Sequence, residues 1–467
     1  MRQEHDFIGI KTIPPDAYWG VHTARAVENF PITGHTVAQM PALIRAFAFV
    51  KKAAAHANLQ LGAISTTQAD AIAKACDDLI AGQLHEQFVT DVIQGGAGTS
   101  TNMNANEVIA NRALEHLGLP KGSYDAIHPN DHVNASQSTN DTYPTAVKIA
   151  TYFGIQELLG ALAALRGAFE AKALEFAGIL KIGRTQLQDA VPMTLGQEFA
   201  AFASMIADDE RRLRESAYLM TEVNMGGTAI GTGINAPLGY VDAVVPKLAE
   251  LSGVPVRAAA NLIAATSDTG AFVDISGVLK RIAAKLSKIS NDLRLLSSGP
   301  QAGVADIRLP ARQAGSSIMP GKVNPVIPEA MNQVCFEVIG NDAAITMACE
   351  AGQLQLNAFE PLVAWALHKS LHHLARACHT LQVNCVEGIA ANQGLLDERI
   401  AASVTLVTAL NPLIGYEKAA AIAKAAIATG KPIAEVAEDL GIMGRAEMQR
   451  LLVAERLTQA GAIKAAH

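Results

Sequence analysis

Apolar residues recur at helical spacing through most of the chain. In the longest run they alternate steps of four and three residues, which places them on one face of a long helix. This run consists of Ile275, Leu279, Ile282, Leu286, Ile289, Leu293 and Leu296. Related runs lie within 155–169 and 367–385. The pattern predicts several long helices packed side by side, and it leaves open whether the 275–296 run packs within one chain or between copies.

Shorter elements are predicted on both sides of this bundle. Pro14, Pro15 and Pro31 favour extended or turn structure near the start, so we expect helices to begin only after them. Few stretches alternate with a period of two, so any sheet should be small. The expected helices begin at Pro41 or span 67–79, 104–117, 417–429, 433–440 and 446–452.

These elements predict an all-α fold with a long central bundle and smaller domains at the two ends. We expect an N-terminal domain over 1–138 with extended segments and helices, and a central bundle over 139–392. A small helical domain should follow over 393–467, because the pattern changes to shorter amphipathic pieces near Ala391.

Composition narrows the class of protein. The 37 Lys and Arg residues against 44 Asp and Glu residues give a net charge of −7, with no basic surplus for nucleic acid. Apolar residues make up 50% and charged residues 17%, which indicates extensive burial, including burial between copies of the chain. No apolar stretch is long enough to span a membrane. Five scattered cysteines and a start without a signal-like segment predict a cytoplasmic protein with reduced thiols.

Four polar, glycine-containing segments interrupt the helical pattern, at 95–107, 128–141, 183–194 and 315–325. Each lies before or runs into a predicted helix, where unpaired amide groups and a partial positive charge suit an anionic ligand. In the last segment, Ser316 and Lys322 could provide an activated hydroxyl. Taken alone, the 315–325 segment is better explained as a helix-capping loop with a solvated lysine.

Two other hypotheses are weaker. The glycines of 95–101 lack the lysine that a phosphate-binding P-loop requires. His368 and His372 stand four residues apart beside an apolar run, without an HExxH motif, so we interpret them as packing residues and expect no metal site.

Together the four segments resemble the aspartase/fumarase superfamily over essentially the whole chain. GSSIMPGKVNP at 315–325 is the signature loop of that superfamily, and GTSTNMNANE, HPNDHVN, QSTND and GRTQLQDAVPMTLGQE occur in the family order. The resemblance implies a homotetramer with a core of long helices and active sites built from three subunits. Within the superfamily, DVIQGGAGTSTNMN, EVNMGGTAIGTG and EAGQLQLN are most similar to the branch that acts on aspartate.

The resemblance also implies roles for individual residues. Ser316 is expected to be the base that removes a proton from the carbon next to the substrate's β-carboxylate. The residues expected to bind that carboxylate are Thr99, Ser138, Thr139 and Ser317. The α-carboxylate is assigned to Lys322 and Asn324, and the amino group to Asn140, Thr185 and Gln186. Many members have a histidine in place of Gln186, paired with a glutamate that matches Glu329.

The activity implied is the reversible elimination of ammonia from L-aspartate to give fumarate, without a cofactor or metal. The expected small-molecule partners are thus L-aspartate, fumarate and ammonia. We expect binding to neither nucleic acid nor a membrane. Two alternatives remain at this stage. One is fumarate hydration, and the other is a crystallin-like scaffold without catalysis, which the joint presence of Ser316, Lys322 and Asn324 disfavours.

Overall fold

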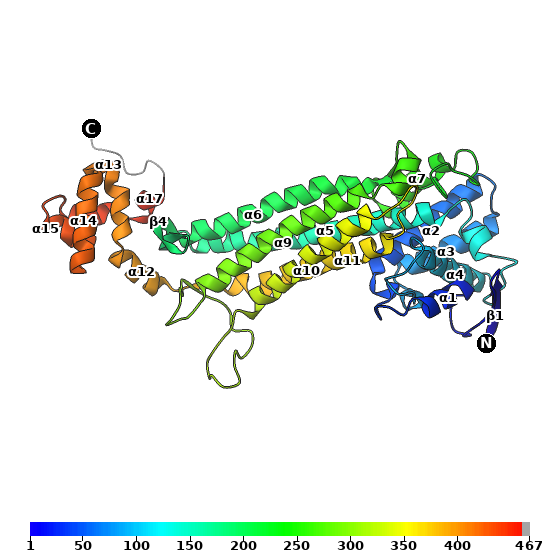
Figure 1. Ribbon diagram of the computed structural model, residues 1–467, viewed down its shortest axis with the longest axis horizontal. Coiled ribbons are helices and arrows are strands. Elements are labelled where there is room, and N and C mark those ends of the chain that lie inside the picture. Colours follow the sequence, from blue (N-terminus) through cyan, green and yellow to red (C-terminus); the bar gives the residue numbers. More distant parts are fainter. Residues whose placement is uncertain (460–467) are drawn as a thin grey trace. The chain divides into compact units, whose positions relative to one another are not determined.

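The computed structural model describes residues 1–459 of the chain (Figure 1). Helices dominate this part, and its strands form four two-stranded sheets. This confirms the predicted all-α class with little sheet. Residues 460–467, the end of the predicted 393–467 domain, lie outside the described residues.

The chain divides into two compact units, each made of three segments. The first unit comprises Met1–Gly160, Arg211–Ala283 and Cys335–Ala375. The second comprises Ala161–Glu210, Ala284–Val334 and the chain from Arg376 onward. The residues proposed for the site are therefore divided between the two units.

The first unit also contains short helices and two small sheets. Its strands are β1 (Arg2–Asp6) antiparallel to β2 (Gly9–Ile13), and β5 (Glu222–Val223) parallel to β6 (Arg257–Ala258). Its shorter helices are α1 (Val21–Asn29), α2 (Pro41–Gln60), α3 (Thr66–Ile80), α4 (Thr99–His116), α7 (Tyr240–Ser252) and α8 (Leu262–Ser267). Helices α2, α3 and α4 match the predicted elements, although α4 begins earlier than expected because its first turn is rich in Thr and Asn rather than apolar residues.

Helix α1 corrects the expectation that the first helix begins at Pro41. Its first amides are held by carboxylates distant in sequence. Glu107 accepts the backbone amides of Gly20 and His22 at 2.7 and 2.8 Å, and Glu4 accepts that of Val21 at 2.9 Å. Because these caps come from other elements, local sequence contains no signal for this helix start.

Five long helices contribute to both units, and within each unit their segments lie side by side (Figure 1). They are α5 (Thr139–Glu175), α6 (Leu195–Ser216), α9 (Gly270–Leu296), α10 (Val326–Glu350) and α11 (Glu360–Asn384). The apolar run of α9 is buried inside the single chain, with Leu286 only 1% exposed. That run therefore packs within one chain, which settles the alternative that the sequence left open.

The second unit adds two antiparallel two-stranded sheets and a cluster of short helices. Its strands are β3 (Leu180–Thr185) antiparallel to β4 (Gln188–Thr194), and β7 (Ile307–Arg308) antiparallel to β8 (Ala390–Ala391). The helices are α12 (Gln393–Ala402), α13 (Asn411–Ile414), α14 (Tyr416–Thr429), α15 (Ile433–Asp439), α16 (Arg445–Leu451) and α17 (Ala454–Leu457). Leu410, Ile422, Ala437 and Met448 form part of a separate core among them. Among the described residues, no helix is both long and apolar enough to cross a membrane.

Candidate active site

Three candidate residues lie at the beginning of α5. Ser138 precedes the helix, Thr139 is its first residue, and Asn140 follows. The Ser138 amide donates to Asp141 Oδ1 at 2.9 Å, and Ser138 Oγ accepts the Asn140 amide at 3.2 Å. The segment therefore forms a helix cap, and these contacts fix the orientation of the Ser138 side chain.

Asp141 holds this segment against a neighbouring turn. Its Oδ2 accepts the amides of Gly226 and Thr228 at 3.0 and 2.9 Å. Burial raises the pKa of Asp141 above its ordinary value, although the backbone amides favour the carboxylate. The carboxyl group thus fixes the start of α5 rather than facing solvent.

Thr99 is the first residue of α4, so this candidate residue also lies at a helix start in the first unit. Gly98 before it has φ +87°, and a Cβ at that position would overlap the ring of Tyr143 on α5. Only glycine fits both the left-handed backbone and this close contact. The Thr99 hydroxyl donates to the carbonyl oxygen of Gly96 at 2.7 Å.

A buried polar network connects the two helix starts. Asn102, one turn into α4, donates from Nδ2 to Thr139 Oγ1 at 3.0 Å and to Asn134 Oδ1 at 3.2 Å. Lys51 donates from Nζ to Asn134 Oδ1 at 2.9 Å and to Gln137 Oε1 at 3.0 Å. Lys51 is 0% exposed, and burial lowers its pKa to about 7.

Sequence reasoning missed this supporting network. A signal was present in the asparagines that recur through 102–111, whereas Lys51 does not stand out from Arg45, Lys52 and His56 in the 43–57 stretch. Buried polar groups of this kind need partners, and the partners are the loop residues that precede α5.

The orientation of the Asn140 side chain follows from its partner. Asn140 Nδ2 donates to the carbonyl oxygen of Ala229 at 2.7 Å, and the Asn140 carbonyl accepts Asn224 Nδ2 at 2.9 Å. A carbonyl oxygen can only accept a hydrogen bond. The side-chain amide nitrogen of Asn140, which donates, must therefore face the Ala229 carbonyl. Asn140 Oδ1 is left as an acceptor at the start of α5.

In the second unit, Thr185 and Gln186 lie at the tip of the β3–β4 hairpin. The sequence placed this polar pair directly before a helix, and the structure corrects that expectation, because α6 begins only at Leu195. Gln186 and Leu187 have φ of +53° and +63°, as a tight two-residue hairpin turn requires. Both Thr185 and Gln186 are exposed.

The 315–325 segment is a loop that closes on itself before α10. The Gly315 amide donates to the Lys322 carbonyl, and Asn324 Nδ2 donates to the Gly315 carbonyl, both at 2.8 Å. A Cβ on Gly315 would overlap the Lys322 carbonyl, so this closure requires glycine. Residues 315–322 thus form a ring.

Ser316 is part of this ring, and its hydroxyl faces the backbone of the same loop. Its Oγ accepts the amides of Ile318 and Met319, each at 3.1 Å. Two backbone donors on one oxygen stabilise negative charge there. Ser317 and Lys322 are exposed beside it, and Glu329 lies in the first turn of α10.

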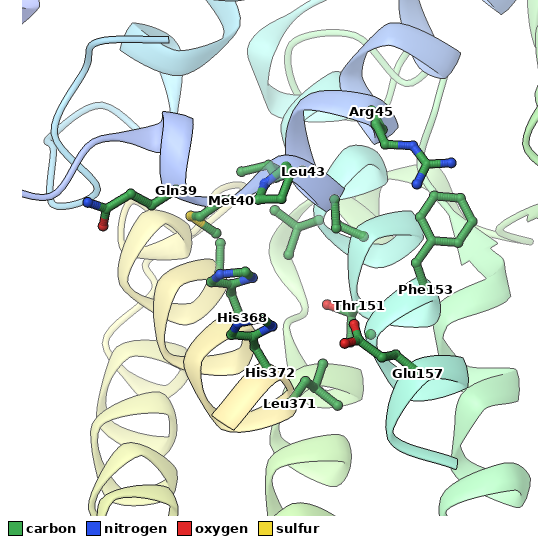
Figure 2. A pocket seen from close by; sticks show the side chains of 16 residues that line it. Gln39, Met40, Leu43, Arg45, Thr151, Phe153, Glu157, His368, Leu371 and His372 are labelled. Atoms are coloured by element: carbon green, nitrogen blue, oxygen red, sulfur yellow. The ribbon is translucent and has the colours of Figure 1, made fainter. Parts of the chain in front are cut away.

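The histidines noted in the sequence lie elsewhere, on α11 of the first unit. Their rings stack with a centroid separation of 5.7 Å and an interplanar angle of 9°. They line a pocket of about 420 Å³, across from Thr151 and Glu157 of α5 (Figure 2). Burial lowers the pKa of His368 to about 4, so its ring is neutral at ordinary pH. Among residues 1–459, no group of three or more His, Cys, Asp or Glu side chains is placed to hold a metal ion.

Comparison with known proteins gives matches along almost the whole chain. A lyase family model matches residues 9–340, and a model of the fumarase C C-terminus matches 406–459. Aspartate ammonia-lyase of Pseudomonas aeruginosa is 56% identical over 98% of this chain and 96% of that protein. Aspartate ammonia-lyase of Helicobacter pylori is 54% identical over 99% of both chains.

Solved structures agree in fold. A fumarate lyase:delta crystallin of Brucella melitensis bound to cobalt superposes with a TM-score of 0.94 and 57% identity, over 97% of this chain and 98% of that one. A class II fumarase of Schistosoma mansoni reaches a TM-score of 0.92 at 34% identity, over 98% of this chain and 99% of that one. The fold is therefore common to relatives described by different reactions.

Proposed function

The chain belongs to the lyase family, within the aspartase/fumarase superfamily, and on this premise we propose that it eliminates ammonia from L-aspartate to give fumarate. It is a carbon–nitrogen lyase, as its full-length relatives of 54–56% identity are. The proposal extends to how its own residues carry out the reaction. The observation that carries this mechanism is the pair of loop amides on Ser316 Oγ.

Ser316 acts as the base in its alkoxide form. A serine hydroxyl is a weak base, and the amides of Ile318 and Met319 favour the alkoxide by donating to the same oxygen. The alkoxide takes a proton from the substrate carbon next to the β-carboxylate, and the electron pair moves into that carboxylate to form an aci-carboxylate. Ser316 then releases the proton before the next turnover.

The β-carboxylate gains negative charge in this step and needs donors that bind the intermediate more tightly than the substrate. Thr99, Ser138, Thr139 and Ser317 are assigned this role, for which the Thr99 hydroxyl has to turn from the Gly96 carbonyl to the substrate. The first three lie at the beginnings of α4 and α5, where the helix dipoles also favour an anion. Lys322 and Asn324 are assigned to the α-carboxylate. The ammonium group of Lys322 provides a charge-assisted contact there.

The amino group is assigned to Asn140, Thr185 and Gln186. A substrate ammonium has three donors and no acceptor, and Asn140 presents its Oδ1 because Nδ2 is bound to Ala229. When the aci-carboxylate collapses, the carbon–carbon double bond forms and the carbon–nitrogen bond breaks. The amine leaves as neutral ammonia, so no group has to protonate it.

Hydration of fumarate is the alternative, and Gln186 disfavours it. Loss of a hydroxyl group from malate needs an acid near the departing oxygen, and a glutamine amide cannot act as one. The direct test follows fumarate absorbance with L-aspartate or L-malate as substrate for the purified protein. Fumarate from L-aspartate with little from L-malate supports the proposal, and comparable rates or a preference for malate overturn it.

We also propose a cytoplasmic homotetramer. Support for association comes from α10, whose outward face in the first unit exposes apolar residues between 336 and 347. Phe336 and Met347 are 60% and 71% exposed, with Ile339, Gly340 and Ala343 between them. Apolar side chains of this size on a helix surface favour packing against another copy. The number four comes from the family resemblance.

A further inference from the structure

One buried carboxylate connects the two candidate segments of the second unit. Asp306 lies directly before β7, and its side chain is 0% exposed. Its Oδ2 lies 2.7 Å from Arg184 Nη1 and 3.1 Å from Lys181 Nζ, and its Oδ1 lies 2.8 Å from Arg399 Nη1. Three cations from two other elements, β3 and α12, thus converge on a single carboxyl group.

Each contact fixes a different piece of chain. Arg184 is followed directly by Thr185 and Gln186 at the hairpin tip. Arg399 belongs to α12, and its guanidinium also donates to the carbonyl of Val304, close to Asp306 in the chain. The hairpin, the segment before β7 and α12 are therefore attached at one point.

The stem of the 315–325 loop begins at the same point. After Asp306, strand β7 pairs with β8. Arg312 then donates from Nε to the Asn384 carbonyl at 2.7 Å and from Nη2 to the Val383 carbonyl at 2.9 Å. These carbonyls end α11, where the helix dipole favours a cation. The ring that contains Ser316 follows three residues after Arg312.

Electrostatics keep this attachment charged. Burial opposes ionisation of Asp306, but the hydrogen bond from Arg184 and the charge of Lys181 outweigh it, so the pKa of Asp306 lies below its ordinary value. Lys181 has a second partner in Glu198 at 2.6 Å. Without the Asp306 charge, three cations would remain together with one carboxylate, and their repulsion would separate the attached segments.

We propose that Asp306 is a positioning residue. It fixes the turn at Thr185 and Gln186 relative to the stem of the 315–325 loop. The inference rests on the proposed function, in which the turn binds the amino group and the loop carries the base. Asp306 itself touches no substrate. Its effect on catalysis acts through Arg184 on one side and through the chain leading to Ser316 on the other.

Hydrogen exchange measured by mass spectrometry tests this in the full chain without substrate. In Asp306→Asn, we expect amides of 181–194 and 306–325 to exchange at least about tenfold faster than in the wild type. Arg184→Gln should accelerate exchange in the hairpin and leave 306–325 less affected. The matched control is Arg166→Gln, which removes a guanidinium paired with Glu210 and Glu170 in the same unit and should change neither segment.

Steady-state kinetics provide the second readout. We expect Asp306→Asn to lower kcat and raise the KM for L-aspartate, each about tenfold or more, with Asp306→Glu recovering part of both. Unchanged exchange in the two segments, or a uniform increase over the whole chain, would overturn the positioning role. If Asp306→Asn does not fold, an unaffected hairpin in Arg184→Gln overturns it equally. An inactive wild type with the expected exchange pattern would refute the proposed function and leave the positioning of the segments supported.

Discussion

Asn140 Nδ2 lies 2.7 Å from the carbonyl oxygen of Ala229, a contact that aims Asn140 Oδ1 away from the 226–229 turn. An amide oriented this way can accept hydrogen bonds from a substrate ammonium but cannot donate to a carboxylate through the same atom.

The first prediction follows from this orientation. Asn140→Ala should raise the KM for L-aspartate about 10- to 100-fold, since a hydrogen bond to a charged group is worth about 1.5–3 kcal/mol. Inhibition by succinate, a dianion without an amino group, should stay close to the wild-type value. Initial rates with and without succinate measure both quantities, and equal weakening of the two ligands would place Asn140 at a carboxylate instead.

The second prediction concerns Gly98, which packs against Tyr143 and places Thr99. Gly98→Ala should destabilise the protein by more than the ~1 kcal/mol of backbone strain and should lower turnover, because its Cβ overlaps the Tyr143 ring. The control is Gly62→Ala, which has φ +74° and open space around its Cβ. Denaturant unfolding and initial rates compare the two, and identical behaviour would show that the ring contact is unimportant.

The third prediction tests the exposed face of α10. Phe336→Arg and Met347→Arg should give species of lower mass than the wild type and little activity, because a charge in a buried apolar interface is costly. Tyr416→Arg, at an exposed residue of α14, should keep the wild-type mass. Light scattering that shows wild-type mass for the α10 variants would exclude this face from the interface.

The fourth prediction concerns Glu360, at the start of α11. The side chain is 3% exposed, its Oε2 has no hydrogen-bond partner, and burial raises its pKa to about 8, with the charge of Lys148 acting in the opposite direction. Between pH 4.5 and 8 the folded state therefore binds more protons at Glu360 than the unfolded state. The contribution to stability is full at low pH and falls by up to about 1.4 kcal/mol per pH unit through this window.

Glu360→Gln mimics the protonated carboxyl and should lose that dependence. We expect the variant to match the wild type near pH 5 and to exceed its unfolding free energy near pH 8. Urea unfolding at a fixed protein concentration and several pH values measures the difference. A constant difference between variant and wild type across the window would show that Glu360 is ionised throughout.

The sequence predicted the helices well where an apolar face repeats. The expected 67–79 and 417–429 became α3 and α14, whose ends differ from these bounds by at most one residue. Helix α1 was missed because Glu107 and Glu4 cap it from distant positions. The period of the apolar residues indicates which face of a segment is buried. It does not indicate caps that are supplied by other elements.

For the candidate site, sequence motifs identified the residues but not their supports. The network of Lys51, Asn102 and Asn134 behind α5, and the Asp306 attachment, depend on contacts between segments far apart in the chain. The turn at Thr185 and Gln186 was expected before a helix, because the polar residues of a tight hairpin and those of a helix cap have similar composition.

We propose Ser316 as the base for elimination from L-aspartate, and turnover by the Ser316→Ala variant tests this role. Fumarate formation from saturating L-aspartate should fall about 10²- to 10⁴-fold relative to the wild type. The circular dichroism spectrum and the mass in light scattering should stay unchanged, because the hydrogen bonds that the hydroxyl accepts among residues 1–459 come from its own loop. Turnover close to that of the wild type in a folded variant would refute this role for Ser316 and assign proton abstraction to another group.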